Sequence, residues 1–210
     1  MFRRLSLIAL LLTLTPKTAK AEGGLTITRP QYQLFKDYQD ALTDERVQKM
    51  KEKDRLPAIA RNQKVKEKEL REAVALGEQQ ATQVEGLEGA SLKGAFQGTV
   101  LQGRTGELRV DASKGHVVTY VQWFNADPAL LDQEACLAAE RAVAAAPLTG
   151  TVFLYANDTA KRDQKVYSAL ISAENAARIK EDQIHDFAQT RYLRLFEKRQ
   201  AGPAASVPSH

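Results

Sequence analysis

The sequence predicts an α+β protein: a helical N-terminal part followed by a mainly antiparallel sheet that helices cover. Two observations lead to this class. Apolar residues before residue 85 recur at helical spacing, whereas the second half contains runs rich in β-branched and aromatic residues at 116–125, 151–157 and 165–171. A helix pattern at 127–147 separates the first of these runs from the second. These four segments define a β-α-β-β core to which the other elements are additions.

The chain begins with the pattern of a cleavable export signal. Arg3 and Arg4 precede the apolar run 5–14, which is too short to span a bilayer as a stop-transfer helix. The small-x-small sequence at 19–21 suits signal peptidase, so we expect residues 1–21 to be removed and the mature chain to begin at Glu22. The alternative is an N-terminal membrane anchor. Cleavage predicts a periplasmic or secreted protein without a transmembrane segment.

Removal of the signal changes the charge balance. The whole chain has 30 Lys and Arg against 26 Asp and Glu, but the signal holds four bases and no acid, which leaves 26 of each. A neutral chain has no bulk attraction for nucleic acid or for an anionic membrane. The single cysteine, Cys136, cannot form an internal disulfide, and its apolar neighbours predict a buried, unreactive thiol.

Residues 22–85 are predicted to form the helical N-terminal region. Pro30 suits the first turn of a helix whose inner face repeats at steps of four, three and four from Gln31. Asp44 is expected to cap a short helix, and Asp54 to cap another with Pro57 in its first turn. A longer helix is predicted from Lys66. The sequence leaves open whether these helices pack on the sheet or form a separate unit.

The segment 59–73 resembles a helix-turn-helix, a family that reads DNA with its second helix. The resemblance rests on the Ile59-Ala60 pair, Val65 after the turn, and Leu70 and Ala73 at packing positions, with Lys64 where the family usually has glycine. The resemblance implies DNA binding, but each base in 66–72 has an acid beside it, so phosphate attraction is largely cancelled. Such charges suit i,i+4 pairs on a solvated helix, such as Lys68 with Glu72. We therefore expect a structural helix pair and no nucleic-acid partner.

The glycine-rich stretch 84–106 marks the expected start of the sheet domain, which we place at 86–199. Residues 95–101 are a candidate strand, although Gly98 weakens it. The alternating segment 107–111 and the turn 112–115 predict a hairpin into the central strand. No glycine motif of a phosphate-binding loop is present in the sequence.

The central strand is predicted at 117–124. Both of its faces are largely apolar, which indicates a strand with neighbours on both sides and places Trp123 in the core. Asp127 and Pro128 form a strong helix start, so a helix over 128–146 should cover one face of the sheet. The polar segment 158–164 predicts a hairpin between antiparallel strands at 151–157 and 165–171.

The C-terminal part leaves one topological question. Residues 191–197 either continue a helix that Ser172 caps or form a last strand, and a strand would give the ferredoxin-like split βαβ order. Arg191, Tyr192 and Arg194 either line a binding surface or pack with their charged ends in water. Residues 200–210 are expected to be a disordered tail.

No catalytic, cofactor-binding or metal-ligating residues, and no cofactor, are predicted. His116, His185 and His210 lack ligand spacing, and no catalytic motif occurs. We expect an exported, non-enzymatic binding or structural protein of the bacterial cell envelope, whose partner is another envelope protein, a second copy or a small ligand. The alternative is an envelope hydrolase with dispersed catalytic residues. Titratable side chains that meet in one cavity with perturbed pKa values would favour the hydrolase.

Overall fold

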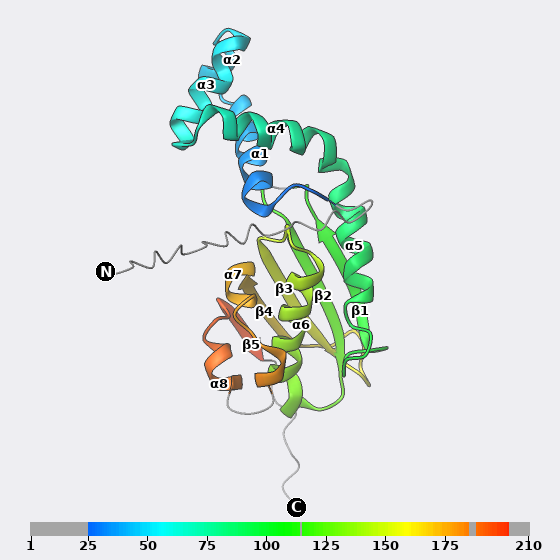
Figure 1. Ribbon diagram of the computed structural model, residues 1–210. Helices are drawn as coiled ribbons and strands as arrows, with labels where there is room; N and C mark the ends of the chain where they lie inside the picture. Colours follow the sequence, from blue (N-terminus) through cyan, green and yellow to red (C-terminus); the bar gives the residue numbers. More distant parts are fainter. Residues whose placement is uncertain (1–24, 114, 185–187, 202–210) are drawn as a thin grey trace, which may run out of the picture.

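The computed structural model describes residues 25–113, 115–184 and 188–201. They form a set of N-terminal helices and a five-stranded sheet with helices packed on one face, which confirms the α+β class (Figure 1). The predicted signal peptide, His185 and His210 lie outside the described residues, as do positions 202–210 of the expected tail. No helix within the described ranges is both long and apolar enough to cross a bilayer.

The N-terminal helices are largely those expected. They are α1 (Arg29–Leu42), α2 (Glu45–Gln48), α3 (Glu52–Gln63), α4 (Glu67–Gln80), the 3₁₀ turn η1 (Ala81–Gln83) and α5 (Val84–Gly94). The Asp44 carboxylate accepts a hydrogen bond from Arg46 N at 2.7 Å and caps α2, as predicted. The prediction that Asp54 caps α3 is wrong, because α3 begins at Glu52 and contains Pro57. Arg55 donates to the carbonyls of Gln48 and Met50, which lie just before this start.

Helix α5 packs on β1, whereas α2, α3 and α4 form a small core of their own. Tyr32 and Phe35 of α1 belong to the main core. A second cluster unites the buried residues of α2, α3 and α4: Val47, Ile59, Ala60, Leu70 and Val74. Helices α1 and α4 cross closely, since a Cβ at Gly77 would lie 2.1 Å from the Phe35 ring. Lys64 adopts a left-handed φ of 57° and closes the α3–α4 turn, so the helix pair forms despite the missing glycine.

The sheet has the strand order β1-β2-β3-β4-β5. Its strands are β1 (Thr105–Asp111), β2 (Val118–Asn125), β3 (Thr151–Asp158), β4 (Lys165–Ser172) and β5 (Lys198–Ala201). Strands β2 and β3 are parallel and the other three pairs are antiparallel, so the predicted β-α-β-β core and both hairpins are confirmed. The ferredoxin-like order is wrong, because β2 and β3 are direct neighbours, whereas a split βαβ unit holds another strand between them.

Helix α6 (Leu131–Ala145) crosses from β2 to β3 and packs on the sheet. Asp127 caps the 3₁₀ turn η2 (Pro128–Leu130) that leads into it, with its carboxylate accepting from Ala129 N at 2.9 Å. The helix face is mostly alanine, so α6 approaches the strands closely and encloses Trp123, Val121 and Leu154, each fully buried. Trp123 is therefore a core residue, as expected.

Three segments differ from the expectation. Residues 95–101 form turns and no strand; Leu101 is buried, and the positive φ of Gly98 suits a turn. Helix α5 continues across the boundary expected at residue 86. Residues 191–197 are divided between α8 (Ala188–Leu193) and a turn, and β5 follows, pairing with β4 and extending into the expected tail. Two short elements, α7 (Ala173–Ala176) and η3 (Glu181–Gln183), precede α8.

Candidate functional site

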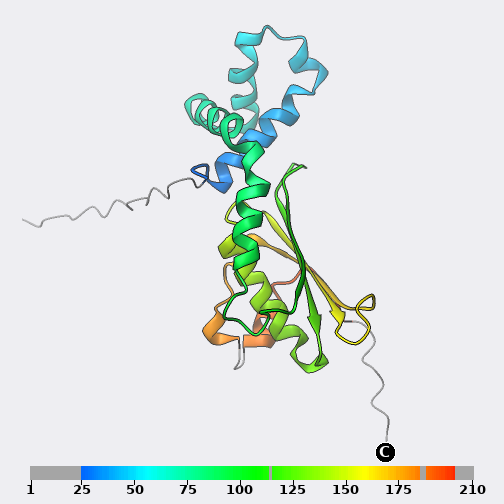
Figure 2. The same ribbon diagram turned by 90° about the vertical axis from the view of Figure 1, so that its right-hand side faces the viewer.

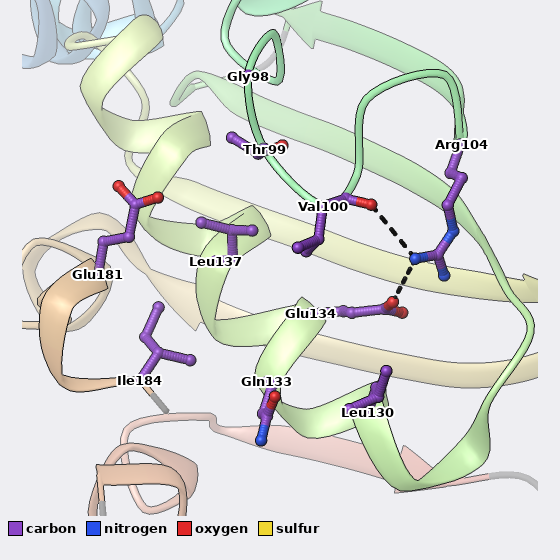
Figure 3. Close-up of a pocket in the computed structure, with 10 residues that line it drawn as sticks. All are labelled: Gly98, Thr99, Val100, Arg104, Leu130, Gln133, Glu134, Leu137, Glu181 and Ile184. Atoms are coloured by element: carbon purple, nitrogen blue, oxygen red, sulfur yellow. Dashed lines mark hydrogen bonds and ion pairs between the residues drawn. The ribbon is translucent and has the colours of Figure 1, made fainter. Parts of the chain in front are cut away.

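A cavity of about 350 Å³ lies between α6, the loop 98–104 and the segment 181–184 (Figure 3). Its lining is mainly apolar, with Leu137 and Ile184 on its walls. Two rim residues, Val100 and Leu130, are the large apolar side chains that are exposed within the described part of the chain, at 61% and 39%. Exposed apolar side chains around one hollow are typical of a binding site for an apolar group.

The loop 98–104 owes its shape to local hydrogen bonds. Gln102 Oε1 accepts from Gly98 N at 2.7 Å, and the Thr99 hydroxyl donates to Phe96 O at 2.8 Å. Gly98 has a φ of 75°, which favours glycine. Leu101 points into the core, so its neighbour Val100 is turned out towards the cavity. A short, hydrogen-bonded loop therefore presents an apolar side chain to solvent.

Arg104 and Glu134 form an ion pair at one wall of the cavity. Arg104 Nη1 lies 2.7 Å from Glu134 Oε1. The same guanidinium donates from Nε to Phe124 O at 3.0 Å and from Nη1 to Val100 O at 3.3 Å, which fixes its position (Figure 3). The Glu134 side chain is only 2% exposed, whereas that of Arg104 is 32% exposed. The wall thus shows the guanidinium to the cavity and keeps the carboxylate beneath it.

Two further donors hold Glu134. Trp123 Nε1 donates to Glu134 Oε2 at 2.8 Å, and Asn125 Nδ2 donates to the same oxygen at 2.7 Å. Both donors come from β2, so the carboxylate ties α6 to the central strand. A buried charge with one ion pair and two hydrogen bonds is tolerated, because these contacts offset the loss of hydration. Trp123, the only tryptophan in the sequence, is hydrogen-bonded to a residue that lines the cavity.

A second cavity of about 290 Å³ is lined by Arg178, Lys180, Arg191, Tyr192 and Arg194, together with Leu195. It gathers the residues Arg191, Tyr192 and Arg194 that the sequence singled out. The structure supports both interpretations of Tyr192: its side chain is buried, and its hydroxyl accepts from Lys180 N at 3.2 Å. The arginines are exposed and line the cavity.

The other titratable candidates lie apart from the first cavity. His116 borders a third cavity of about 210 Å³, together with Arg29 and Glu174. Cys136 is fully buried, as predicted, and burial raises the pKa of its thiol to about 12. No group of three His, Cys, Asp or Glu residues suited to a metal ion occurs among the residues that the structure describes.

Comparison of the chain with protein-family models, with curated proteins and with solved structures finds no match.

The sequence did not reveal the cavity. Arg104 stands in a glycine-rich stretch and Glu134 on a helix 30 residues later, and only the pairing of β1 with β2 brings the two together. One signal was present: Glu134 occupies the alanine-rich inner face of α6, where an acid needs a buried partner. The position of Trp123, whose indole N–H requires an acceptor, pointed to the same place.

Proposed function

We propose that the protein is an exported, non-enzymatic binding protein of the bacterial cell envelope and that it binds an uncharged apolar group in the cavity beside α6. The observation that supports this most is that Val100 and Leu130, two exposed apolar side chains, rim a mainly apolar hollow. A cavity near 350 Å³ suits a small ligand or one or two apolar side chains of a partner.

The charge of the site favours an uncharged group. Arg104 is already neutralised by Glu134, and its Nε and Nη1 are used in bonds to the chain. A charged ligand would have to lose its hydration against a wall that carries no net charge, which is unfavourable. An apolar group releases ordered water from the cavity without disturbing the ion pair.

Binding rather than turnover is supported by where the shifted pKa values occur. Burial raises the pKa of Glu88 to about 7, and hydrogen bonds from Ser113 lower that of Asp111 to about 2. Neither residue lines the cavity beside α6. The acids that do line it, Glu134 and Glu181, are each engaged in an ion pair with an arginine.

We also propose that the α3–α4 helix pair does not bind DNA. Both bases of α4 are paired within that helix: Arg71 lies 2.7 Å from Glu67, and Lys68 lies 3.8 Å from Glu72. Paired bases are poor at neutralising phosphates. A gel shift with duplex DNA at low salt should show no binding at micromolar protein, and salt-sensitive retardation of the DNA would contradict this.

A fluorescence titration tests the cavity. The neutral dye N-phenyl-1-naphthylamine should brighten on binding and accept energy from Trp123, whose hydrogen-bond partner Glu134 lines the site. Val100→Asp should weaken dye binding at least roughly tenfold, because it places a charge at the apolar rim. Gln97→Asp is the control, since residue 97 is exposed in the adjacent turn and outside the lining. Equal affinity of both variants and the parent protein would refute the site.

Export is tested separately by intact mass. Protein recovered from the periplasm or medium of a signal-competent bacterial host should begin at Glu22. Full-length protein in the cytosol would contradict the proposed location. An envelope substrate that the protein turns over, with activity lost on a single His or Glu substitution, would instead support the hydrolase.

A further inference from the structure

The face of the sheet opposite α6 is not covered by any described element (Figure 2). Residues on this face alternate with buried ones along each strand: in β2, Thr119, Val121 and Trp123 are buried, whereas their neighbours are half-buried. We call this surface the open face. Its members on the three central strands are Val118, Tyr120, Gln122, Phe124, Thr151, Phe153, Tyr155, Ser168 and Leu170.

The open face has the composition of an interior. An antiparallel sheet with one side in water normally presents polar residues there. Here Tyr120, Phe153 and Tyr155 form a continuous aromatic row, with ring centroids 5.8 and 5.9 Å apart. None of the cavities beside α6, at the basic cluster or at His116 includes these rings. A broad apolar surface of this kind fits another broad surface.

The two edges of the open face differ in charge. On β1, Glu107 and Asp111 flank Arg109, which leaves one net negative charge; Arg109 also lies 4.0 Å above the Tyr120 ring. On the opposite side, Lys198 pairs with Leu170 in the β4–β5 ladder and Lys165 lies 5.7 Å above the Tyr155 ring, both on the open face. Neither lysine has a described salt bridge. The face is therefore acidic at β1 and basic at β4–β5.

We propose that the open face is the interface of a homodimer in which two sheets pack face to face. A two-fold axis that lies between the sheets and parallel to β3 places β1 of one copy opposite β5 of the other. This arrangement brings the acidic edge of each copy to the basic edge of its partner twice, as an isologous interface requires. An axis perpendicular to the strands would instead oppose like edges.

The area is sufficient for a dimer. Four strands of seven or eight residues and the four-residue β5, about 4.8 Å apart, present roughly 500–600 Å² in projection per copy. Two such faces bury on the order of 1,000–1,200 Å², which reaches the range of specific interfaces. Aligned packing of two twisted sheets supplies a core about 10 Å thick, with the aromatic row at its centre. The interface lies on the side of the sheet away from the α6 cavity, so it goes beyond the proposed function and leaves that cavity accessible.

Sedimentation equilibrium tests the dimer. The mature protein should behave as a dimer at tens of micromolar, and Phe153→Arg should shift it to monomer because a charge then stands in the aromatic row. Gln97→Arg adds the same charge on the other side of the molecule and should leave the dimer intact. Circular dichroism confirms that both variants are folded. A monomeric parent protein at 100 µM would overturn the proposal, and would do so without bearing on the dye titration of the cavity.

A zero-length carbodiimide crosslink tests the axis. Asp111 and Lys198 occupy opposite edge strands, about 19 Å apart across four strand spacings, so they cannot be joined within one chain. In the proposed dimer β1 lies opposite β5 of the partner, and the strand register places Lys198 level with Arg109 and two residues, about 7 Å, from Asp111. This offset is within reach of a lysine side chain, so mass spectrometry of a mixture of ¹⁵N-labelled and unlabelled protein should show a mixed-isotope 111–198 peptide. Asp111→Lys should weaken dimerisation roughly tenfold, and adding Lys198→Asp should restore it. A dimer without this crosslink and without rescue would overturn the face-to-face arrangement.

Discussion

Two buried glutamates of similar exposure differ in almost every other respect. Glu134 is 2% exposed and Glu88 is 3% exposed. Glu134 has Arg104, Trp123 and Asn125 as partners. Glu88 accepts one hydrogen bond, from Leu148 N at 2.7 Å, and its Oε2 has no described hydrogen-bond partner. The difference shows that burial alone does not decide what a carboxylate does in a fold; its partners do.

The consequences diverge accordingly. The charge of Glu134 is balanced by Arg104, and the ion pair forms part of the cavity wall. Burial raises the pKa of Glu88 to about 7, opposed by the hydrogen bond from Leu148 and by the charge of Arg29. Glu88 joins α5 to the turn before β3, so that junction is expected to respond to pH, whereas the cavity wall is held by the ion pair of Arg104 and Glu134.

The largest effect should come from introducing a new carboxylate that has no partner. Val121 is fully buried at the centre of β2. Val121→Asp would place an unpaired charge among apolar side chains at a cost of several kcal/mol, comparable with about 5–15 kcal/mol for the whole fold. We expect loss of cooperative unfolding, measured by circular dichroism in urea. Val100→Asp, an equal change at an exposed position, is the control, and a Val121→Asp protein as stable as this control would contradict the packing.

Removing the well-partnered carboxylate should have the next largest effect. Glu134→Ala leaves Trp123 Nε1 and Asn125 Nδ2 without their acceptor and Arg104 without its counter-charge. We expect a loss of about 3–5 kcal/mol in the free energy of unfolding, measured by urea titration. Glu134→Gln retains one acceptor oxygen and should lose less. If Glu134→Ala lost under about 1 kcal/mol, the network would be shown to contribute little.

Glu88, the carboxylate with few partners, should instead make the stability of the fold depend on pH. Between the ordinary pKa of 4.5 and about 7, folded Glu88 keeps a proton that the unfolded chain has released, so the free energy of unfolding falls as pH rises. Above this range both states are ionised and the loss is complete, on the order of 3 kcal/mol. Stability of the parent protein minus that of Glu88→Gln, followed from pH 4 to pH 8.5, isolates this contribution. A stability difference that does not change with pH would contradict a raised pKa of Glu88.

The contrast between the two glutamates also shows which features could be predicted from the sequence and which could not. Asp44, Asp127 and the alternation of β2 act through neighbours a few residues away, so caps and strands could be predicted. The ion-pair partner of Glu134, Arg104, lies 30 residues away and the hydrogen-bond partner of Glu88, Leu148, lies 60 residues away, so both contacts depend on strand register and helix placement. The ferredoxin-like order failed for a similar reason: β2 and β3 pair directly, and no local pattern in the sequence encodes which strands become neighbours.

The smallest effect should come from charges that remain in water. Lys68 and Glu72 lie 3.8 Å apart on α4, with side chains 87% and 58% exposed. Their hydration is nearly retained, so a double-mutant cycle with Lys68→Ala and Glu72→Ala should give a coupling of about 0.3 kcal/mol that decreases in 1 M salt. A coupling above about 1 kcal/mol would mean that α4 is shielded from solvent by a partner on its charged face. A small value would show that the same carboxylate chemistry which fixes α6 to β2 contributes little once water competes for it.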